Sequence, residues 1–162
     1  MLTQGIHTMS AVLNHLPDPT GSPTVVFLKR AAVLLGFGKY PRSEREFAML
    51  ARQPVAPAVV ERLLRFGVPG RYLVFITPQR TLTHRKARGE MLTPDEGDRA
   101  VRAARVLALG ETVFGDSARA LQWLARPIKE FRGSSPLDMM TSETGARLVE
   151  ELLIGIDEGY FA

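Results

Sequence analysis

Apolar residues in this chain recur mostly at intervals of three and four, which is the period of an α-helix with one buried face. The stretches that carry this period are bounded by helix start and stop signals. The clearest start lies at residues 93–96 (TPDE), which combine a capping hydroxyl, a proline in the first turn and a glutamate that can bond back to the helix start. We expect this helix to run to Phe114, with Gly115 ending it. The whole pattern predicts an all-α fold.

Two helices are predicted further upstream. Residues 43–46 (SERE) have the sequence of a capping box and open a helix that extends to about Gln53. A second helix lies between Pro57 and Gly67, because glycine favours the left-handed conformation found at helix ends.

The segment that follows is less regular. Residues 71–76 (RYLVFI) suit either a strand or a short helix, and we interpret them as a short helix because helical signals flank them on both sides. The next helix is then capped by Thr77, has Pro78 at its first position and ends at Gly89.

The last third of the chain predicts three more helices. Asp116 caps the first, which Pro127 ends, and Ser135 begins a short second one. Thr141 or Ser142 caps the last helix. Its apolar positions repeat at three and four residues and predict one face for the core: Leu148, Val149, Leu152, Leu153 and Ile156.

Charge is distributed unevenly. Residues 1–41 carry three basic and one acidic side chain, residues 42–105 carry thirteen and seven, and residues 106–162 carry five and nine. Within the middle segment, seven basic residues from Arg62 to Arg88 follow one another without an intervening acid. A basic block followed by an acidic one suggests two surfaces with different partners, and the alternative is a solvated surface of mixed charge.

The order of elements from 57 to 105 is typical of a helix-turn-helix DNA-binding unit, whose second helix lies in the major groove. Leu82 of that helix is predicted to face the core, and the exposed positions are Gln79, Arg80, Thr83, His84, Lys86 and Ala87. Gln79 and Arg80 lie in the first turn, where they could pair with adenine and guanine. The residues nearer the far end that we expect to hold phosphates are Arg85, Lys86 and Arg88.

This assignment explains why no acid accompanies these residues in the sequence. We expect their counter-charge to be a nucleic acid rather than neighbouring carboxylates. The alternative is that the basic helix is only a solvated face.

Several classes of protein are disfavoured. The chain has no cysteine, which excludes a disulfide framework and cysteine metal sites and fits a reducing cytoplasm. Its three histidines are scattered and form no ligand pair. The longest apolar run, from Ala31 to Gly38, is about eight residues against the roughly 20 that cross a bilayer. No charged leader precedes an apolar segment, so no secretory signal is expected. An enzyme is also not expected, because no nucleophile lies beside a base and the acids near helix starts are explained by capping.

From Thr93 to the end, the chain resembles the antitoxins of the Xre/MbcA/ParS family, which are partners of RES-domain toxins. The motifs that carry the resemblance are LTPDEGDRAVRAARVLAL, VFGD, A--WL--P, F-G-SPLDMM and T--GA--VEELL-GI--GYFA. The preceding ITPQRTLTHRKARGE resembles the DNA-binding segment of the same family. Gly97 departs from the pattern, since a serine is usual there.

The resemblance implies an Xre-like helix-turn-helix domain at 42–105 and a small helical toxin-binding domain at 106–162. Residues 1–41 match no segment of the family, and we expect them to form a variable N-terminal helical extension that serves dimerisation or packs against the helix-turn-helix unit. The toxin-binding domain would obstruct the toxin's NAD-consuming site, while the helix-turn-helix domain would bind the operator of its own operon. The antitoxin itself would bind no NAD or other cofactor and catalyse nothing. Helix-turn-helix proteins commonly bind DNA as dimers, so we also expect a homodimer with its contact in residues 1–66.

The candidate toxin-binding residues lie in a loop and at the C-terminal end. The two aromatics at the end could fill a partner's pocket. These candidates are Phe131, Arg132, Gly133, Ser134, Met139, Met140, Gly159, Tyr160 and Phe161. The alternative function is a stand-alone repressor whose C-terminal domain dimerises or senses a ligand.

Overall fold

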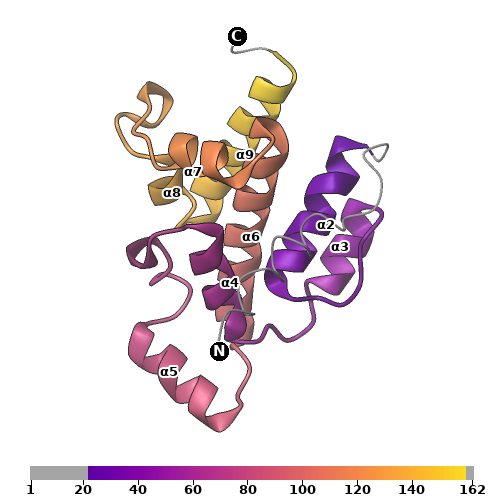
Figure 1. Cartoon of the computed structure of the whole chain (residues 1–162), viewed down its shortest axis with the longest axis vertical. Helices are drawn as coiled ribbons and strands as arrows, with labels where there is room; N and C mark the ends of the chain where they lie inside the picture. Colours follow the sequence, from indigo (N-terminus) through magenta and orange to yellow (C-terminus); the bar gives the residue numbers. More distant parts are fainter. Residues whose placement is uncertain (1–21, 160–162) are drawn as a thin grey trace, which may run out of the picture.

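The computed structural model describes residues 22–159, which fold into helices and connecting turns with no strand in that range (Figure 1). The α-helices are α2 (Pro23–Leu35), α3 (Glu44–Leu50), α4 (Ala58–Phe66), α5 (Gln79–Arg88), α6 (Pro94–Phe114), α7 (Ser117–Leu124), α8 (Pro136–Met139) and α9 (Glu143–Asp157). Two 3-10 helices, η1 (Gly70–Tyr72) and η2 (Lys129–Phe131), lie in the connections. The all-α prediction is confirmed.

Helix α6 is the axis of the molecule, and α2, α4, α7 and α9 all pack against it (Figure 1). It can be covered from several directions because its buried positions include many small residues, which let neighbouring helices approach closely. The buried apolar side chains of α6 are Ala100, Ala103, Ala104, Val106, Leu107, Ala108 and Leu109. The predicted boundary between residues 105 and 106 falls inside this continuous helix.

Helix α2 is attached to the axis by an apolar face and by a charged pair. Six of its thirteen residues are buried, among them Phe27 and Leu28. Arg30 forms an ion pair with Glu111 of α6 at 2.8 Å. The helix lies within the predicted N-terminal extension at 1–41, of which residues 1–21 lie outside the part that the structure describes.

The end of α2 is held by α4. The guanidinium of Arg62 donates to the carbonyl oxygens of Leu34 and Leu35, at 2.7 and 2.8 Å, and so satisfies acceptors that the helix leaves unpaired. Gly36 ends the helix in the left-handed conformation. A Cβ at this position would lie 2.3 Å from Nη2 of Arg62, so a side chain here would displace the guanidinium.

The local signals place most helix ends correctly. Thr93 and Glu96 form the predicted capping box, and α6 runs from Pro94 to Phe114 as expected. Gly67 and Gly115 end their helices in the left-handed conformation. The predicted caps Asp116, Ser135 and Ser142 each accept a backbone N–H at the start of α7, α8 and α9.

Three local predictions are wrong. Helix α3 ends at Leu50 rather than near Gln53, and its capping box is only half formed: Ser43 accepts from the Glu46 N–H, but Glu46 accepts from the Arg42 N–H. Residues 71–76 are helical only through Tyr72 and continue as turns. Thr77 does not cap α5; the residue before that helix is Pro78, which has no side-chain acceptor.

No helix in residues 22–159 is both long enough and apolar enough to span a bilayer.

Candidate functional sites

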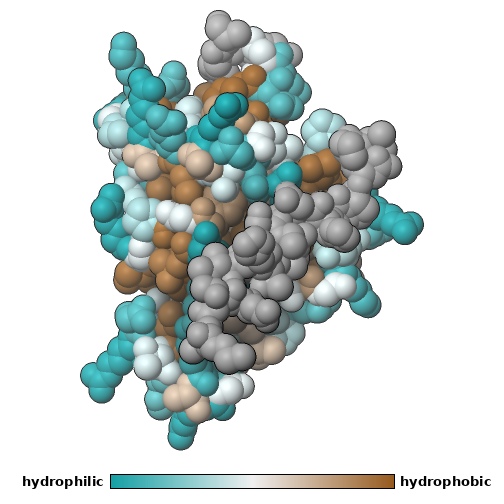
Figure 2. Space-filling view, in the orientation of Figure 1, coloured by the Kyte–Doolittle hydropathy of each residue, from teal (hydrophilic) through white to brown (hydrophobic). Residues whose placement is uncertain are grey.

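Helix α5 lies at one end of the molecule and projects from the rest (Figure 1). Leu82 is its one buried residue. The predicted exposed positions Gln79, Arg80, Thr83, His84, Lys86 and Ala87 are all exposed, and Leu82 faces inward as predicted. Figure 2 shows hydrophilic residues over this end of the molecule. The first-turn side chains are therefore accessible to a large partner.

The expectation that the basic residues of α5 lack local counter-charges is wrong. Nζ of Lys86 contacts the carboxylate of Glu61 on α4. Arg85 pairs with Glu96, with Nε 3.1 Å from Oε2, and Nη1 lies 3.6 Å from Glu90. Arg88 lies 3.7 Å from the other oxygen of Glu90. These acids are distant in sequence or follow the helix, so inspection of the basic run alone could not find them.

The remaining cation of the helix differs from these three. Arg80 is exposed and has no carboxylate within ion-pairing distance among residues 22–159. It stands beside Gln79 at the start of the helix. The hydroxyl of Thr83 is engaged differently, because it donates to the backbone carbonyl of Gln79 at 3.0 Å.

Glu96 is the most constrained acid near α5. The residue is 8% exposed, and its carboxylate accepts from the Thr93 N–H at 2.8 Å and from the Thr77 hydroxyl at 3.0 Å. Burial raises the pKa of Glu96, but the hydrogen bonds from Thr93 and Thr77 and the charge of Arg85 lower it by a larger amount. The pKa of Glu96 therefore lies below its ordinary value. The group is therefore ionised at neutral pH. Sequence analysis assigned Glu96 only to the capping box.

The predicted toxin-binding loop is ordered by local bonds. Ile128 donates its N–H to the Ser134 carbonyl at 3.2 Å and accepts from the Gly133 N–H at 3.0 Å, which closes the loop on itself. Arg132 has a left-handed backbone with φ of 52° and is exposed, as is Gly133. Phe131 is half-buried and packs against the core.

The two methionines that follow differ in accessibility. Met139 is half-buried, whereas Met140 has 0% exposure and belongs to the core. The prediction that Met140 contacts a partner is therefore wrong for the chain in this conformation, because α8 turns its side chain inward. The capping box of α8 fixes this turn: Ser135 and Asp138 bond reciprocally, with the Ser135 hydroxyl donating to Asp138 at 2.6 Å. The same bonds hold the pKa of Asp138 below its ordinary value.

Helix α9 confirms its predicted face in part, because Val149 and Leu153 are buried and Leu152 and Ile156 are half-buried, but Leu148 is not. Ala146, Val149 and Leu153 face the core, but Leu148 is 43% exposed and Ile154 is 46% exposed. Gly145 brings the start of the helix onto α8, where a Cβ would lie 2.1 Å from the Met139 carbonyl oxygen.

Of the candidates at the C-terminal end, Gly159 is exposed with φ of 80°. Tyr160 and Phe161 lie outside the described residues, so their assignment stays a prediction.

One half-buried cation was missed by sequence analysis. Arg105 on α6 pairs with Glu150 of α9 and with Glu44 of α3, both at 3.0 Å. Its guanidinium lies 5.4 and 5.6 Å from the ring centroids of Phe27 and Phe47. A single arginine on a helix offers no sequence signal for such a contact, since its partners are 45 and 61 residues away.

Fold and sites together describe an all-helical protein with a projecting basic helix at one end of a long central helix and a small helical unit around the other end. Within that class, residues 109–159 match the model of the Antitoxin Xre/MbcA/ParS C-terminal toxin-binding domain. The resemblance to this family is thereby confirmed for residues 109–159.

Individual relatives carry the same name. A protein of Pseudomonas putida named Antitoxin Xre is 45% identical over 85 residues, which are 52% of this chain and 54% of the relative. A second Antitoxin Xre, from Yersinia enterocolitica, is 35% identical over 52% of this chain and 58% of its own length. A third, from Photorhabdus laumondii, is 37% identical over 41% and 46%. The chain thus spans about half the length of the relatives that it matches.

Proposed function

We propose that this protein is the antitoxin of a type II toxin–antitoxin pair, and that its C-terminal domain binds and inhibits a RES-domain toxin that consumes NAD. The observation that carries the proposal is the match of residues 109–159 to a toxin-binding domain. The relatives named Antitoxin Xre support it. The antitoxin obstructs the toxin's active site and supplies no catalytic group or cofactor, so the purified chain should not turn over NAD.

The exposed apolar residues of α9 are the best candidates for the contact with the toxin. Leu148 and Ile154 expose large side chains on a helix whose other exposed residues include Arg147 and Glu151. Single exposed apolar side chains are common on protein surfaces, but these two lie within residues 109–159, the part that matches a toxin-binding domain. The exposed loop residues Arg132 and Gly133 form a second contact, and the predicted terminal contact at Tyr160 and Phe161 is retained as part of the proposal.

Co-expression with the RES-domain protein encoded beside its gene tests this function. The wild-type chain should restore growth and cellular NAD, and Leu148→Glu should lose that protection because a charge would be buried in the interface. Leu64→Glu is the matched control, since Leu64 is 46% exposed but lies on α4. Equal protection by both variants would remove α9 from the proposed interface. No protection by the wild-type chain would contradict the antitoxin function and leave the stand-alone repressor.

We further propose that α5 binds operator DNA and represses the protein's own operon, which implies a location in the cytoplasm. Gln79 and Arg80 contact base edges, with Thr83 and His84 beside them, while Lys86 and Arg88 contact phosphates. The support is the exposure of these side chains on a projecting helix and the unpaired charge of Arg80 within the described part of the chain. Lys86 must exchange Glu61 for a phosphate when it binds, which lowers its net contribution.

Binding to a duplex from upstream of its own gene, compared with a random duplex of equal length, tests the DNA proposal. Arg80→Ala should cost about 1–3 kcal/mol on the upstream duplex and little on the random one. Lys86→Ala should weaken both duplexes and lower the salt slope by about one. If neither variant changes affinity for either duplex, α5 is not the element that binds DNA.

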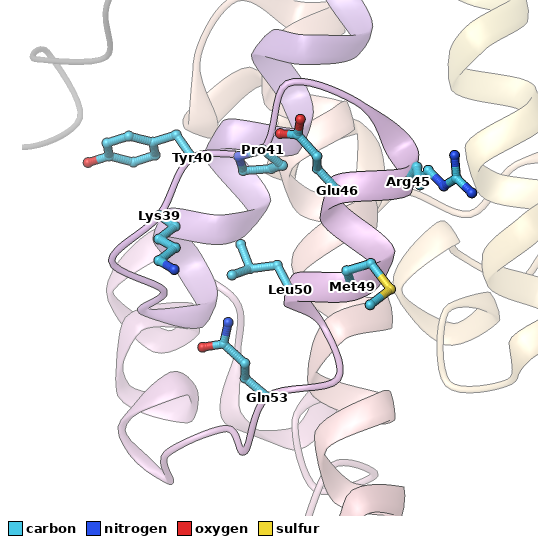
Figure 3. A pocket seen from close by; sticks show the side chains of 8 residues that line it. All are labelled: Lys39, Tyr40, Pro41, Arg45, Glu46, Met49, Leu50 and Gln53. Carbon is cyan, nitrogen blue, oxygen red and sulfur yellow. The ribbon is translucent and has the colours of Figure 1, made fainter.

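A homodimer through the surface around α3, within the predicted contact region of residues 1–66, completes the proposal, because two half-sites require two copies. Tyr40 and Met49 are 49% and 63% exposed beside a surface hollow that Lys39, Leu50 and Gln53 line (Figure 3). In light scattering without toxin, Met49→Glu should shift the protein toward the monomer, while Leu148→Glu should not. A wild-type monomer at tens of micromolar, with no change on adding DNA, would contradict the dimer.

A further inference from the structure

We propose that Glu96 and Arg85 are positioning residues that fix the orientation of α5 on the start of α6, and that Arg85 does this instead of binding phosphate. The inference rests on the proposed DNA binding by α5. Helix capping explains the contact of Glu96 with Thr93 but not its pairing with Arg85, and the inference gives that pairing a role.

Helix α5 has little apolar attachment to the rest of the protein. Leu82 is its one buried side chain, and the next buried apolar residue along the chain is Leu92, beyond the connection to α6. A helix held by one apolar side chain can rotate about that point unless polar contacts restrain it. DNA recognition is sensitive to such rotation, because base contacts require defined donor and acceptor positions.

Glu96 supplies the restraint at both ends of α5. One carboxylate oxygen, Oε1, accepts from the hydroxyl of Thr77, which lies just before the helix, at 3.0 Å. The same oxygen accepts from Nη2 of Arg85, in the second half of the helix, at 3.4 Å, and Oε2 lies 3.1 Å from Nε of Arg85. One carboxylate therefore contacts the residue that enters α5 and a residue near its exit.

Glu96 is itself held in place by α6. It is the reciprocal glutamate of the capping box, and its Oε2 accepts from the Thr93 N–H at 2.8 Å. The position of this carboxylate is thus set by the first turn of a 21-residue helix that packs against most of the protein. Through Glu96, the position of α6 therefore fixes the orientation of α5.

Burial distinguishes this contact from the other ion pairs of α5. The side chains of Arg85 and Glu96 are 18% and 10% exposed, whereas those of Arg88 and Glu90 are 63% and 42% exposed. Exposed pairs contribute little to a fixed geometry, while partly buried ones leave a charge uncompensated if one member is removed. A guanidinium turned inward to a carboxylate is also poorly placed to receive a phosphate.

Whether Glu96→Gln raises or lowers the affinity for DNA tests the inference. Glutamine can still accept the Thr93 N–H, so Glu96→Gln preserves the capping box but removes the charge that holds Arg85. If Glu96 only adds negative charge near the DNA, its neutralisation should strengthen binding. If it positions α5, affinity for the upstream duplex should fall, by roughly tenfold for the loss of one charged hydrogen-bonding contact.

Glu90→Gln is the matched control. Glu90 also lies near the basic residues of α5, at 3.6 Å from Arg85 and 3.7 Å from Arg88, but its side chain is 42% exposed and forms no hydrogen bond or ion pair with Thr77 or α6 among residues 22–159. Its neutralisation should raise affinity or leave it unchanged. Opposite signs for Glu96→Gln and Glu90→Gln support positioning, and a gain in affinity for both overturns it.

A double-mutant cycle tests whether Arg85 and Glu96 affect DNA binding through their contact with each other. Arg85→Ala and Glu96→Gln should each weaken binding to the upstream duplex, and the double variant should bind no worse than the weaker single variant. Arg85→Lys keeps the positive charge but cannot contact both carboxylate oxygens of Glu96 as the guanidinium does. Its affinity should therefore lie between those of Arg85→Ala and the wild type. Thermal melts give the folded fraction by which each affinity is corrected. Additive losses in the cycle would overturn the inference.

The Arg80→Ala variant shows whether α5 binds DNA at all, independently of the positioning role of Glu96. A loss of affinity for the upstream duplex with Arg80→Ala, together with a gain for Glu96→Gln, rejects positioning but keeps DNA binding by α5. A wild-type chain that binds neither duplex rejects both.

Discussion

Helices α2 and α5 both attach to α6, but by different means. Helix α2 buries six of thirteen residues against its neighbours, while α5 buries one of ten and is held by the Glu96 network. Apolar burial is non-directional and contributes most of a domain's stability, whereas hydrogen bonds to a buried carboxylate fix geometry. The comparison suggests that α2 maintains the fold, and that α5 can be altered without unfolding the rest.

Two arginines repeat this contrast. Arg105 pairs with carboxylates from α3 and α9 and lies over two aromatic rings, so it joins the first, middle and last segments of the described chain. Burial would lower its pKa, but the bonds to Glu150 and Glu44 raise it above the ordinary value. Arg85 joins only α5 to the start of α6. Loss of the first should therefore destabilise the whole fold, and loss of the second should affect one helix.

The largest effect is expected on the α2 side. Leu28 has 0% exposure within the core, and Leu28→Ala should lower the free energy of unfolding by roughly 4 kcal/mol through lost burial and the cavity left behind. Denaturant titration measures it, and both DNA and toxin binding should fall together. A loss below about 1 kcal/mol would contradict the view that α2 is part of the core.

Arg105→Ala should have the next largest effect. It leaves the partly buried carboxylate of Glu150 without its partner and removes the packing over Phe27 and Phe47, a combined loss on the order of 3 kcal/mol, while Glu44 is 54% exposed and can be solvated. The thermal midpoint should drop by several degrees. Arg147→Ala is the control, because its pair with Glu151 is exposed on the same α9 and should contribute little. Equal midpoints for the two variants would refute the joining role of Arg105.

Leu82→Ala should cost less, about 2 kcal/mol, because the surroundings of α5 can relax. Its effect should be local. Amide hydrogen exchange is expected to accelerate in α5 while α2 and α6 keep their protection, and toxin binding should persist as DNA binding falls. Uniform acceleration across all helices would mean that α5 is part of the same cooperative unit as α2.

The smallest expected effect is a pH dependence. Because the pKa of Glu96 is lowered in the folded protein, the ionised carboxylate contributes stability above the unfolded pKa, and this contribution is lost as the pH falls through the folded pKa. Unfolding measured from pH 7 downward should show a slightly shallower acid decline for Glu96→Gln than for the wild type. If both proteins lost the same stability as the pH fell, the contacts of Glu96 would not favour its ionised form.

The sequence by itself determined where α4, α6, α7, α8 and α9 begin or end. A capping hydroxyl such as that of Thr93 and a stop glycine such as Gly115 act within one helical turn, so their effect is written in adjacent residues. It also determined that Leu82 faces inward and that Arg80 faces outward, because one strongly apolar position fixes the orientation of a short basic helix.

Only the tertiary structure decided which charges meet and which side of α9 is buried. Glu61 reaches Lys86 across 25 positions of sequence, and Glu96 reaches Thr77 across 19. Leu148 and Val149 are equally apolar neighbours, yet the first is 43% exposed and the second fully buried. Successive helical residues point about 100° apart, so the choice between them depends on where α6 lies, and that position results from the packing of all the helices together.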